Sequence, residues 1–468
     1  MTSDEFRKIG YELIDFIADY RDNVANYPVM SRVKPGETFA ALPEKAPEEG
    51  GDLDNIRSEL EDMIPALTNW QSPKFFAYFP ANSELSSVLG DLVSSGLGQL
   101  GLNWQASPAL SEFEEKMTVW MRDLLGLPDY FDGVFQDTAS TSTLLAMLCA
   151  REQSTNHSQT CGGLQAEEKP LVVYVSEQSH SSVEKAALLA GFGRDNIRAI
   201  ATDENFALDV ASLEQAIEND LAKGLLPCAI TATTGTTATA ALDPVADIAE
   251  IAKKYNLWLH VDSAMAGSAM IIPENRWMWQ GIEKADSIVL NPHKWLGAVF
   301  DISLFYVRDS EHLVRVMSTN PSYLQTATDD VVKNYRDWGI PLGRRFRALK
   351  LWFLLRSEGV NGLRARLKRD MDNARWLAER VQKAKDWELV APVYLQTVCV
   401  RHKKTDLSAE ENNRHNHDWA EAINNSGKAM LTPALADGKW MVRVSIGSLT
   451  TEHSDVKELW EIMQEAVL

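Results

Sequence analysis

Short apolar runs that alternate with longer helical stretches dominate the chain from about residue 85 to about residue 350. The runs are rich in β-branched residues and apolar on both sides, which is typical of strands buried on both faces of a sheet. They are GVFQ (133–136), LVVYV (171–175), CAITATT (228–234), WLHV (258–261), SIVL (287–290) and ISLFYV (302–307). Helical patterns such as TSTLLAMLCAREQ and PVADIAEIAKKYN lie between them. This alternation predicts an α/β fold with a mostly parallel sheet that helices cover on both faces.

Two further regions flank the predicted sheet. Near the N-terminus, Phe6, Ile9 and Leu13 recur at helical spacing, and a second helical pattern covers residues 52–67. Helices this short must pack on the main body or on a partner chain to bury their apolar faces. Late in the chain, RARLKRDMDNARWLAERVQKA predicts a long amphipathic helix with short strands after it. We therefore expect an N-terminal helical segment (1–84), a large α/β domain (85–360) and a small α+β domain (361–468).

Composition excludes several classes of protein. The 468 residues are 45% apolar and 24% charged, which is typical of a globular protein, and the formal net charge of −20 argues against nucleic-acid binding and against an anionic membrane surface. The four cysteines have no CxxC spacing, so neither a disulfide framework nor a zinc ribbon is indicated. A secretory signal pattern and an apolar stretch of membrane-spanning length are both missing. We expect a cytoplasmic protein.

Polar side chains follow five of the predicted strands. Ligands of open α/β sheets bind outside the carboxyl ends of the strands, so these residues are the first candidates for a site. They are Asp137 to Thr143 after GVFQ, Ser176 to His180 after LVVYV, Gly235 to Thr237 after CAITATT, Asp262 to Ala264 after WLHV, and Asn291 to Lys294 after SIVL. Hydroxyl groups, a histidine, a carboxylate and a lysine therefore converge at one edge of the predicted sheet.

The stretch from Thr138 to Ser142 begins a predicted helix and brings several hydroxyl groups to its first turn. Free N–H groups and the positive end of the helix dipole make such a helix start a site for phosphate. An ordinary Ser/Thr N-cap has the same appearance, so this stretch alone does not decide between the two. No GxxxxGK[ST] motif is present. The stretch GLGQLG (96–101) matches GxGxxG but follows a helical pattern, so we discount it as a dinucleotide site.

Asp262 and Lys294 each end an apolar strand, where an unpaired charge is costly. Asp262 could cap the next turn, or form a metal pair with His260, but no third ligand at a suitable spacing is evident and we expect no metal. Most lysines are solvated surface groups. A lysine that ends a core strand between His293 and Trp295 instead favours a lowered pKa and a nucleophilic amine.

A lysine, a carboxylate and a phosphate-binding helix start have a known joint use. They hold pyridoxal 5'-phosphate, with the lysine for its aldehyde, the carboxylate for its ring nitrogen and the helix start for its phosphate. His180, at the end of a third strand, is placed to stack on the ring, although a lone histidine is more often an ordinary polar residue. The combination predicts pyridoxal 5'-phosphate as the cofactor.

Six segments closely resemble the group II pyridoxal-phosphate-dependent decarboxylases, and among them the aromatic-L-amino-acid (DOPA-type) decarboxylases. They are SPKFFAYFPANS, NWQASPALSEFEE, SHSSVEKAA, HVDSAMAGSA, NPHKW and WGIPLGRRFRALKLW. The similarity runs over nearly the whole chain. It implies the fold-type I transferase fold, with a mostly parallel seven-stranded sheet. It also implies a homodimer in which the N-terminal segment wraps the partner subunit and the active sites are shared between subunits.

The resemblance also implies roles for single residues. Lys294 matches the Schiff-base lysine, Asp262 the partner of the pyridinium nitrogen, and His180 the histidine stacked on the ring, with Ala264 under the other ring face. Tyr323, in STNPSYLQTATDD, matches a loop tyrosine that protonates the α-carbon after carbon dioxide leaves. Similar aldehyde synthases carry phenylalanine at that position. Further cofactor and phosphate contacts match Ala139, Ser140, Thr237, Ser287, Asn291 and His293.

The positions that match the substrate pocket of these enzymes are mostly aromatic or apolar. They are Trp70, Tyr78, Phe79, Pro80, Ala81, His293, Phe300 and Gly343, with Leu100 and Leu102 from the other subunit. The animal enzymes carry threonine in place of Ala81 and phenylalanine in place of Leu102, which leaves the ranking among aromatic substrates open. Histidine decarboxylases resemble each other in carrying serine in place of Gly343, and a glycine leaves room for a larger ring. The lack of an obvious carboxylate-binding arginine disfavours glutamate.

The implied reaction converts an aromatic L-amino acid (L-DOPA, 5-hydroxytryptophan, tryptophan, tyrosine or phenylalanine) to its amine and carbon dioxide. Several alternatives stay open. They are an aromatic aldehyde synthase, a histidine decarboxylase, a transamination reaction and a non-catalytic dimeric paralogue that binds pyridoxal phosphate. The complete set of Lys294, Asp262, His180 and Tyr323 favours the decarboxylase.

Overall fold

The computed structural model of the chain describes all residues except 52, 320–321, 325, 327, 330 and 468. Its contacts divide the chain into two compact units. One unit contains residues 1–80, 375–390 and 398–468, and the other contains residues 81–374 and 391–397. The three-segment division expected from the sequence stays a prediction. The long helix α11 (Arg347–Lys383) spans residues 360 and 361, but Gly359 directly before them has non-helical backbone angles (φ 62°, ψ 162°).

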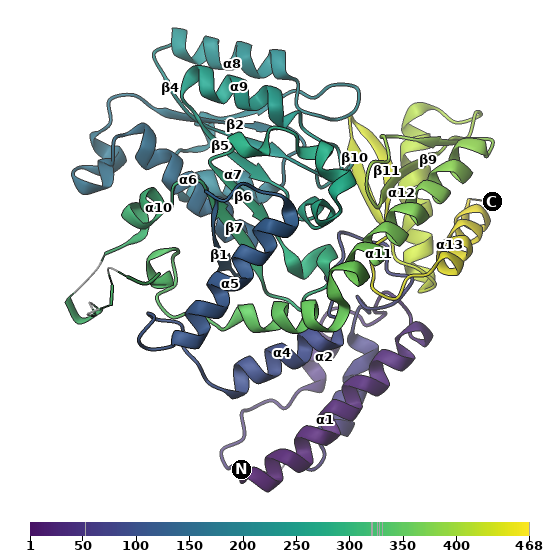
Figure 1. Cartoon of the computed structure of the whole chain (residues 1–468). Helices are drawn as coiled ribbons and strands as arrows, with labels where there is room; N and C mark the ends of the chain where they lie inside the picture. Colours follow the sequence, from purple (N-terminus) through teal and green to yellow (C-terminus); the bar gives the residue numbers. More distant parts are fainter. Residues whose placement is uncertain (52, 320–321, 325, 327, 330, 468) are drawn as a thin grey trace. The chain divides into compact units, whose positions relative to one another are not determined.

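The unit of residues 81–374 and 391–397 is built on a seven-stranded sheet (Figure 1). Its strands are β1 (Asp132–Gln136), β2 (Leu171–Ser176), β3 (Ile197–Ile200), β4 (Leu226–Thr233), β5 (Trp258–Asp262), β6 (Ser287–Leu290) and β7 (Ser303–Val307). The order is β1-β7-β6-β5-β4-β2-β3. The pairs β2–β3, β2–β4, β4–β5 and β5–β6 are parallel, and β7 is antiparallel to both β1 and β6. The predicted mostly parallel α/β sheet is therefore confirmed.

Helices cover this sheet on both faces, because successive side chains of a strand point to opposite sides. In β2, Val173 and Val175 belong to a buried cluster with Leu145 of α6 (Ala139–Ser154). The intervening Tyr174 instead donates its hydroxyl to Asp220 of α8 (Val210–Ala222) at 3.1 Å. The other helices of this unit are α4 (Leu85–Gly96), α5 (Pro108–Leu125), α7 (Ser181–Leu189), α9 (Val245–Tyr255) and α10 (Ser310–Met317), and α11 begins in it.

The unit of residues 1–80, 375–390 and 398–468 combines the N-terminal helices with a small sheet. The helices are α1 (Ser3–Asn23), α2 (Glu37–Ala41), α3 (Ile56–Met63), α12 (Ala409–Ser426) and α13 (His453–Ala466). The strands β8 (Trp387–Leu389), β9 (Thr397–His402), β10 (Thr432–Ala436) and β11 (Lys439–Ser445) follow the order β10-β11-β9-β8. A capping box of Thr2 and Glu5 starts α1, yet no residue of α1 is buried. None of the described helices is long and apolar enough to cross a membrane.

Candidate active site

The carboxyl ends of β4, β5 and β6 lie side by side, because these strands are parallel and paired in register. Thr233 pairs with Asp262, and Asp262 pairs with Val289. Asn291 follows this edge directly, and its backbone N–H donates to the carbonyl of Ala264 at 2.9 Å. The structure therefore brings together the polar residues that follow these strands, as parallel pairing requires.

Asp262 is buried at this edge, with 5% of its surface exposed. Its Oδ1 accepts the backbone N–H of Ala264 at 3.0 Å, and its carbonyl accepts the N–H of Thr234 at 2.9 Å. Within the described residues Asp262 forms no ion pair within 4.0 Å, and its charge acts on the imidazole of His180. A protonated ring nitrogen is the kind of group that such a carboxylate would stabilise.

His180 occupies the N-cap position of α7, which fixes the direction of its ring. Its Nδ1 accepts the backbone N–H of Ser182 at 3.1 Å and lies 2.7 Å from that residue's hydroxyl oxygen. Because Nδ1 accepts, the neutral ring carries its proton on Nε2. His180 is exposed, yet desolvation by its neighbours lowers its pKa; the charge of Asp262 raises that pKa and the charge of Lys294 lowers it. The charges of Asp262 and Lys294 therefore both act on the His180 ring.

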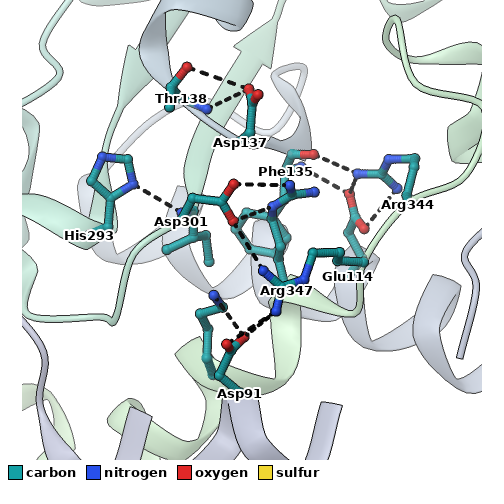
Figure 2. Close-up of polar contacts among 12 residues, drawn as sticks. Asp91, Glu114, Phe135, Asp137, Thr138, His293, Asp301, Arg344 and Arg347 are labelled. Carbon is teal, nitrogen blue, oxygen red and sulfur yellow. Dashed lines mark hydrogen bonds and ion pairs between the residues drawn. The ribbon is translucent and has the colours of Figure 1, made fainter. Parts of the chain in front are cut away.

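Lys294 lies in a single turn of π-helix, Pro292–Leu296, between β6 and β7. It is partly exposed and has non-helical backbone angles (φ −92°, ψ −113°), while His293 and Trp295 on either side are buried. The Nδ1 of His293 accepts the N–H of Ile302 at 3.0 Å (Figure 2). Burial lowers the pKa of His293 to about 4, with a further contribution from the charge of Lys294. His293 is therefore a neutral imidazole that carries its proton on Nε2.

The start of α6 has the features of an anion site. The N-cap residue Thr138 makes no side-chain capping hydrogen bond, so the first N–H groups of α6 stay available to a ligand. Ala139 is buried and Ser140 is exposed at this end. Asp137 lies directly before the cap, and its Oδ1 accepts the N–H of Thr138 at 2.6 Å (Figure 2). A carboxylate therefore lies directly beside the first N–H groups of α6.

Several buried polar atoms at this edge have no hydrogen-bond partner among the described residues. They include the Asn291 Oδ1, the Thr234 hydroxyl and the Ser179 hydroxyl. Such atoms are costly unless a ligand or water pairs with them. Together with the uncapped start of α6 and the unpaired carboxylate of Asp262, they fit a phosphorylated pyridine ring. The described residues contain no group of three or more His, Cys, Asp or Glu side chains that could hold a metal.

Two of the predicted cofactor contacts lie differently from the rest. Ser287 begins β6, at the opposite end of the strand from Asn291, and is fully buried. Its hydroxyl lies 2.9 Å from both the Trp258 Nε1 and the His260 Nδ1, so the structure does not bring it to the carboxyl edge. Thr237 is partly exposed in the segment after β4.

Tyr323 lies in a short 3-10 turn, Ser322–Leu324, and its side chain is outside the described part of the chain.

The predicted substrate positions belong to both units. In the first unit, Trp70 and Tyr78 stack with ring centres 5.7 Å apart, and the Arg443 guanidinium lies 4.9 Å from the ring centre of Phe79. Pro80 is buried there. In the second unit the predicted positions are Ala81, Leu100, Leu102, His293, Phe300 and Gly343.

Phe300 is 59% exposed, and its ring centre lies 4.8 Å from that of His293. A Cβ atom added to Gly343 would lie 2.9 Å from a methyl group of Leu100. These contacts place Phe300 beside His293 and Gly343 beside Leu100. Any geometry that would combine positions from the two units remains a prediction.

A network of charges that the sequence did not predict lies near the loop that follows Lys294, partly buried and partly exposed (Figure 2). Asp301 accepts two hydrogen bonds from Arg347, both 3.2 Å long. Asp91 of α4 pairs with the fully buried Lys350 at 2.9 Å and with Arg345 at 3.1 Å. Because Ile302 follows Asp301 and binds His293, this network fixes the loop beside the predicted lysine. The acidic and basic partners of each pair are more than 40 residues apart in the sequence, so no local motif could have revealed the pairing.

Comparison with known proteins agrees with this geometry. The chain matches the pyridoxal-dependent decarboxylase conserved domain over residues 35–403. It is 39% identical to the phenylacetaldehyde synthase of Arabidopsis thaliana, over 99% of this chain and 96% of that protein. It is 40% identical to tyrosine decarboxylase 4 of Petroselinum crispum, over 99% of this chain and 94% of that protein. The crystal structure of Oryza sativa TDC with PLP and tryptamine superposes with a TM-score of 0.96 at 34% identity, covering 100% of this chain and 98% of that one. The chain belongs to the pyridoxal-dependent decarboxylases.

Proposed function

We propose that this protein removes carbon dioxide from an aromatic L-amino acid and releases the amine, with pyridoxal 5'-phosphate as its cofactor. The observation that supports this most directly is the convergence of Lys294, Asp262 and His180 at the edge of the sheet that the α6 start also borders. The relatives named tyrosine decarboxylase and phenylacetaldehyde synthase support an aromatic substrate. Which aromatic amino acid is preferred stays open.

Each side chain has a separate task in this proposal. The first N–H groups of α6 bind the phosphate group, and Asp262 holds a proton on the ring nitrogen. His180 packs against the ring, and Lys294 contributes the amine that bonds to the aldehyde. When bound, pyridoxal phosphate supplies an aromatic ring that accepts the electron pair left by the departing carboxylate. The protein provides orientation and charge, which are the main sources of acceleration in such a site.

Groups beside Lys294 favour an apolar, aromatic substrate. Phe300 offers an exposed ring, and His293 is kept neutral, so neither provides a positive charge for an acidic side chain. The neutral imidazole of His293 still has one N–H to donate. A ring with a hydroxyl or an indole N–H can therefore combine apolar contact with one hydrogen bond.

An aromatic aldehyde synthase is the second candidate, because the phenylacetaldehyde synthase of Arabidopsis thaliana is as similar to the chain as the decarboxylases are. Tyr323 favours the amine, since we propose that its hydroxyl returns a proton to the α-carbon. We also propose a homodimer that shares its active sites. The exposed apolar residues of α4 and the loop after it support this, because contiguous apolar patches mark interfaces. They are Leu85, Leu89, Leu92, Val93, Leu97 and Leu100. The cytoplasmic location stays a prediction from the sequence.

The test is to purify the chain, add pyridoxal phosphate, reduce the product with borohydride and locate the labelled peptide by mass spectrometry. We expect the label on Lys294, and no label in a Lys294→Ala control. Carbon dioxide, amine and aldehyde are then measured with L-DOPA, 5-hydroxytryptophan, tryptophan, tyrosine and phenylalanine. Equal amounts of amine and carbon dioxide from at least one of them are expected. A labelled protein that releases no carbon dioxide from any of the five would contradict the proposal.

A further inference from the structure

The backbone carbonyl groups from Lys294 to Gly297, in the turn that carries the lysine, accept hydrogen bonds from outside the turn. The carbonyl of Lys294 accepts the Nδ2 of Asn82 at 3.3 Å, and the carbonyl of Gly297 accepts the N–H of Glu84 at 3.0 Å. The two carbonyls between them, those of Trp295 and Leu296, accept Nη1 and Nη2 of one side chain, Arg366, at 2.9 and 2.6 Å. Because buried carbonyls need partners, these outside groups determine where the turn lies.

Arg366 acts together with a second residue of α11. Asp370 lies four positions later, so both side chains project from the same face of the helix. The indole N–H of Trp295 donates to the Asp370 Oδ2 at 2.9 Å, and both Trp295 and Asp370 are completely buried. Trp295 is therefore held at both ends, by Arg366 at its carbonyl and by Asp370 at its ring. The residue held in this way directly follows Lys294.

Packing of α11 against its neighbours would not require such an arrangement. Arg364, on the same helix, shows the ordinary case, because its Nε donates to a single distant carbonyl, that of Ile271, at 2.8 Å. Arg366 instead bridges two consecutive carbonyls of a turn whose lysine has non-helical backbone angles. A shift of this turn moves the Cα of Lys294 directly, and errors of about 1 Å in reacting groups cost about a hundredfold in rate.

We infer that Arg366 and Asp370 are positioning residues that hold the Trp295 backbone and ring, and thereby aim the Lys294 amine at the cofactor aldehyde. This inference rests on the proposed role of Lys294. Neither residue touches the reacting atoms. Their effect should therefore appear in the bond between the lysine and the aldehyde, and not in the binding of the phosphate or the ring.

The experiment compares two ligands of the cofactor-free protein. Pyridoxal phosphate bonds covalently to Lys294, and the rate of capture is followed by absorbance and by mass after borohydride reduction. The compound 4-deoxypyridoxine 5'-phosphate lacks the aldehyde, so its dissociation constant reports only the phosphate and ring sites. In Arg366→Met we expect capture to slow by about tenfold or more, the effect typical of residues that orient a reactive group. The dissociation constant of the deoxy compound should change by less than about threefold. The matched control Arg364→Met should leave both quantities unchanged.

A second pair of variants keeps the test decisive if Arg366→Met folds poorly. Trp295→Phe removes the indole N–H together with part of the buried ring and should slow capture, whereas Asp370→Asn keeps an acceptor for that N–H and should capture at close to the wild-type rate. Capture at the wild-type rate in Arg366→Met, or in Trp295→Phe, would overturn the inference. So would a parallel loss of capture and of deoxy-compound affinity, which indicates general damage to the site. A wild-type chain that captures no pyridoxal phosphate would instead refute the proposed function itself.

Discussion

Arg344 donates two hydrogen bonds to the carboxylate of Glu114, at 2.9 and 2.5 Å, and both side chains are almost completely buried (Figure 2). The pair also binds both backbone polar groups of a single residue of β1, Phe135. Glu114 accepts the N–H of Phe135 at 2.9 Å, and Arg344 donates to the carbonyl of Phe135 at 2.6 Å. The pair therefore joins α5, β1 and the segment that leads into α11, and Phe135 lies three residues before Thr138, where the predicted phosphate site begins.

Removing one member of this pair should strongly destabilise the protein. In Glu114→Gln the Arg344 guanidinium loses a buried counter-charge, and such losses cost about 3–5 kcal/mol. The double variant Glu114→Leu/Arg344→Met should lose less, because no unpaired charge remains. Urea denaturation of the cofactor-free protein measures both. The exposed pair Lys383 and Glu379 is the control, and Lys383→Met should cost less than about 1 kcal/mol. A Glu114→Gln protein as stable as the Lys383→Met protein would contradict the expectation.

Asp137 should weaken phosphate binding at the start of α6. Its carboxylate binds the N–H of Thr138, directly before the helix start that we propose for the phosphate group, and like charges repel. Asp137→Asn keeps the hydrogen-bonding oxygen and removes the charge, so the dissociation constant of 4-deoxypyridoxine 5'-phosphate should fall by several-fold. The gain should shrink at high salt, because screening weakens charge repulsion. If the constant rises in Asp137→Asn, the carboxylate contributes to binding and the phosphate lies elsewhere.

The sequence predicted the sheet better than it predicted the surroundings of the site. All six apolar runs coincide with strands, because burial on both faces leaves a clear local pattern. The run IRAI of β3 was missed. It forms an edge strand with an arginine and partly exposed residues, so its pattern is weak. The reversed direction of β7 could not be read from apolar content at all, since pairing direction depends on the connections between strands.

In the candidate site, too, some residues could be predicted from a local sequence pattern and others could not. Lys294, Asp262 and the start of α6 could be predicted because they directly follow strands, and parallel pairing brings strand ends together. Arg366 and Asp370 lie more than 70 residues after the lysine turn, on a helix where charged residues are common. Only the folded chain shows that they bind that turn. Ser287 shows the opposite difficulty, because a serine beside a motif can satisfy its hydroxyl entirely within the core.

His260 should make stability depend on pH. It is completely buried beneath Asp262, and burial lowers its pKa to about 4, although the charge of Asp262 raises it. The unfolded chain takes up this proton near the ordinary value of 6.5, so between about pH 6.5 and 4 the unfolded state binds more protons. The free energy of unfolding therefore falls as the pH falls in this range, by about 1.4 kcal/mol per pH unit from this residue.

Buried acids act in the opposite direction, because the pKa of Asp243 is raised to about 7 and that of Asp370 to about 6, mainly by burial. The expected result therefore concerns the difference between wild type and His260→Gln. The variant should be less stable at neutral pH, and its deficit should shrink as the pH is lowered toward 5. Urea denaturation at several pH values measures this deficit. A deficit that stays constant over the range would show that His260 is protonated equally in both states.

Tyr323→Phe should change the product and leave the binding of the cofactor intact. If the Tyr323 hydroxyl returns the proton to the α-carbon, its loss slows amine release and allows aldehyde formation to compete. Aldehyde synthases that resemble this chain carry phenylalanine at the matching position. We expect the ratio of aldehyde to amine to rise at least about tenfold, measured by chromatography with tyrosine and tryptophan as substrates. Capture of pyridoxal phosphate by Lys294 serves as the control and should be unchanged. Amine formed alone and at the wild-type rate would remove Tyr323 from the mechanism.

Asp262→Asn should separate the capture of the cofactor from its use. The amide has the size of the carboxylate and can still accept the N–H of Ala264, so we expect the fold to persist. The charge that holds a proton on the ring nitrogen is lost, and losing a buried charge partner costs several kcal/mol, which corresponds to a fall in turnover of about a hundredfold or more. Capture of pyridoxal phosphate by Lys294 should continue. Asp286→Asn is the matched control, because Asp286 accepts the N–H of Leu259 at 2.8 Å near the other end of β5 and should leave turnover unchanged. Near-normal turnover in Asp262→Asn would mean that the ring nitrogen does not need this carboxylate, and another residue would then have to supply the charge.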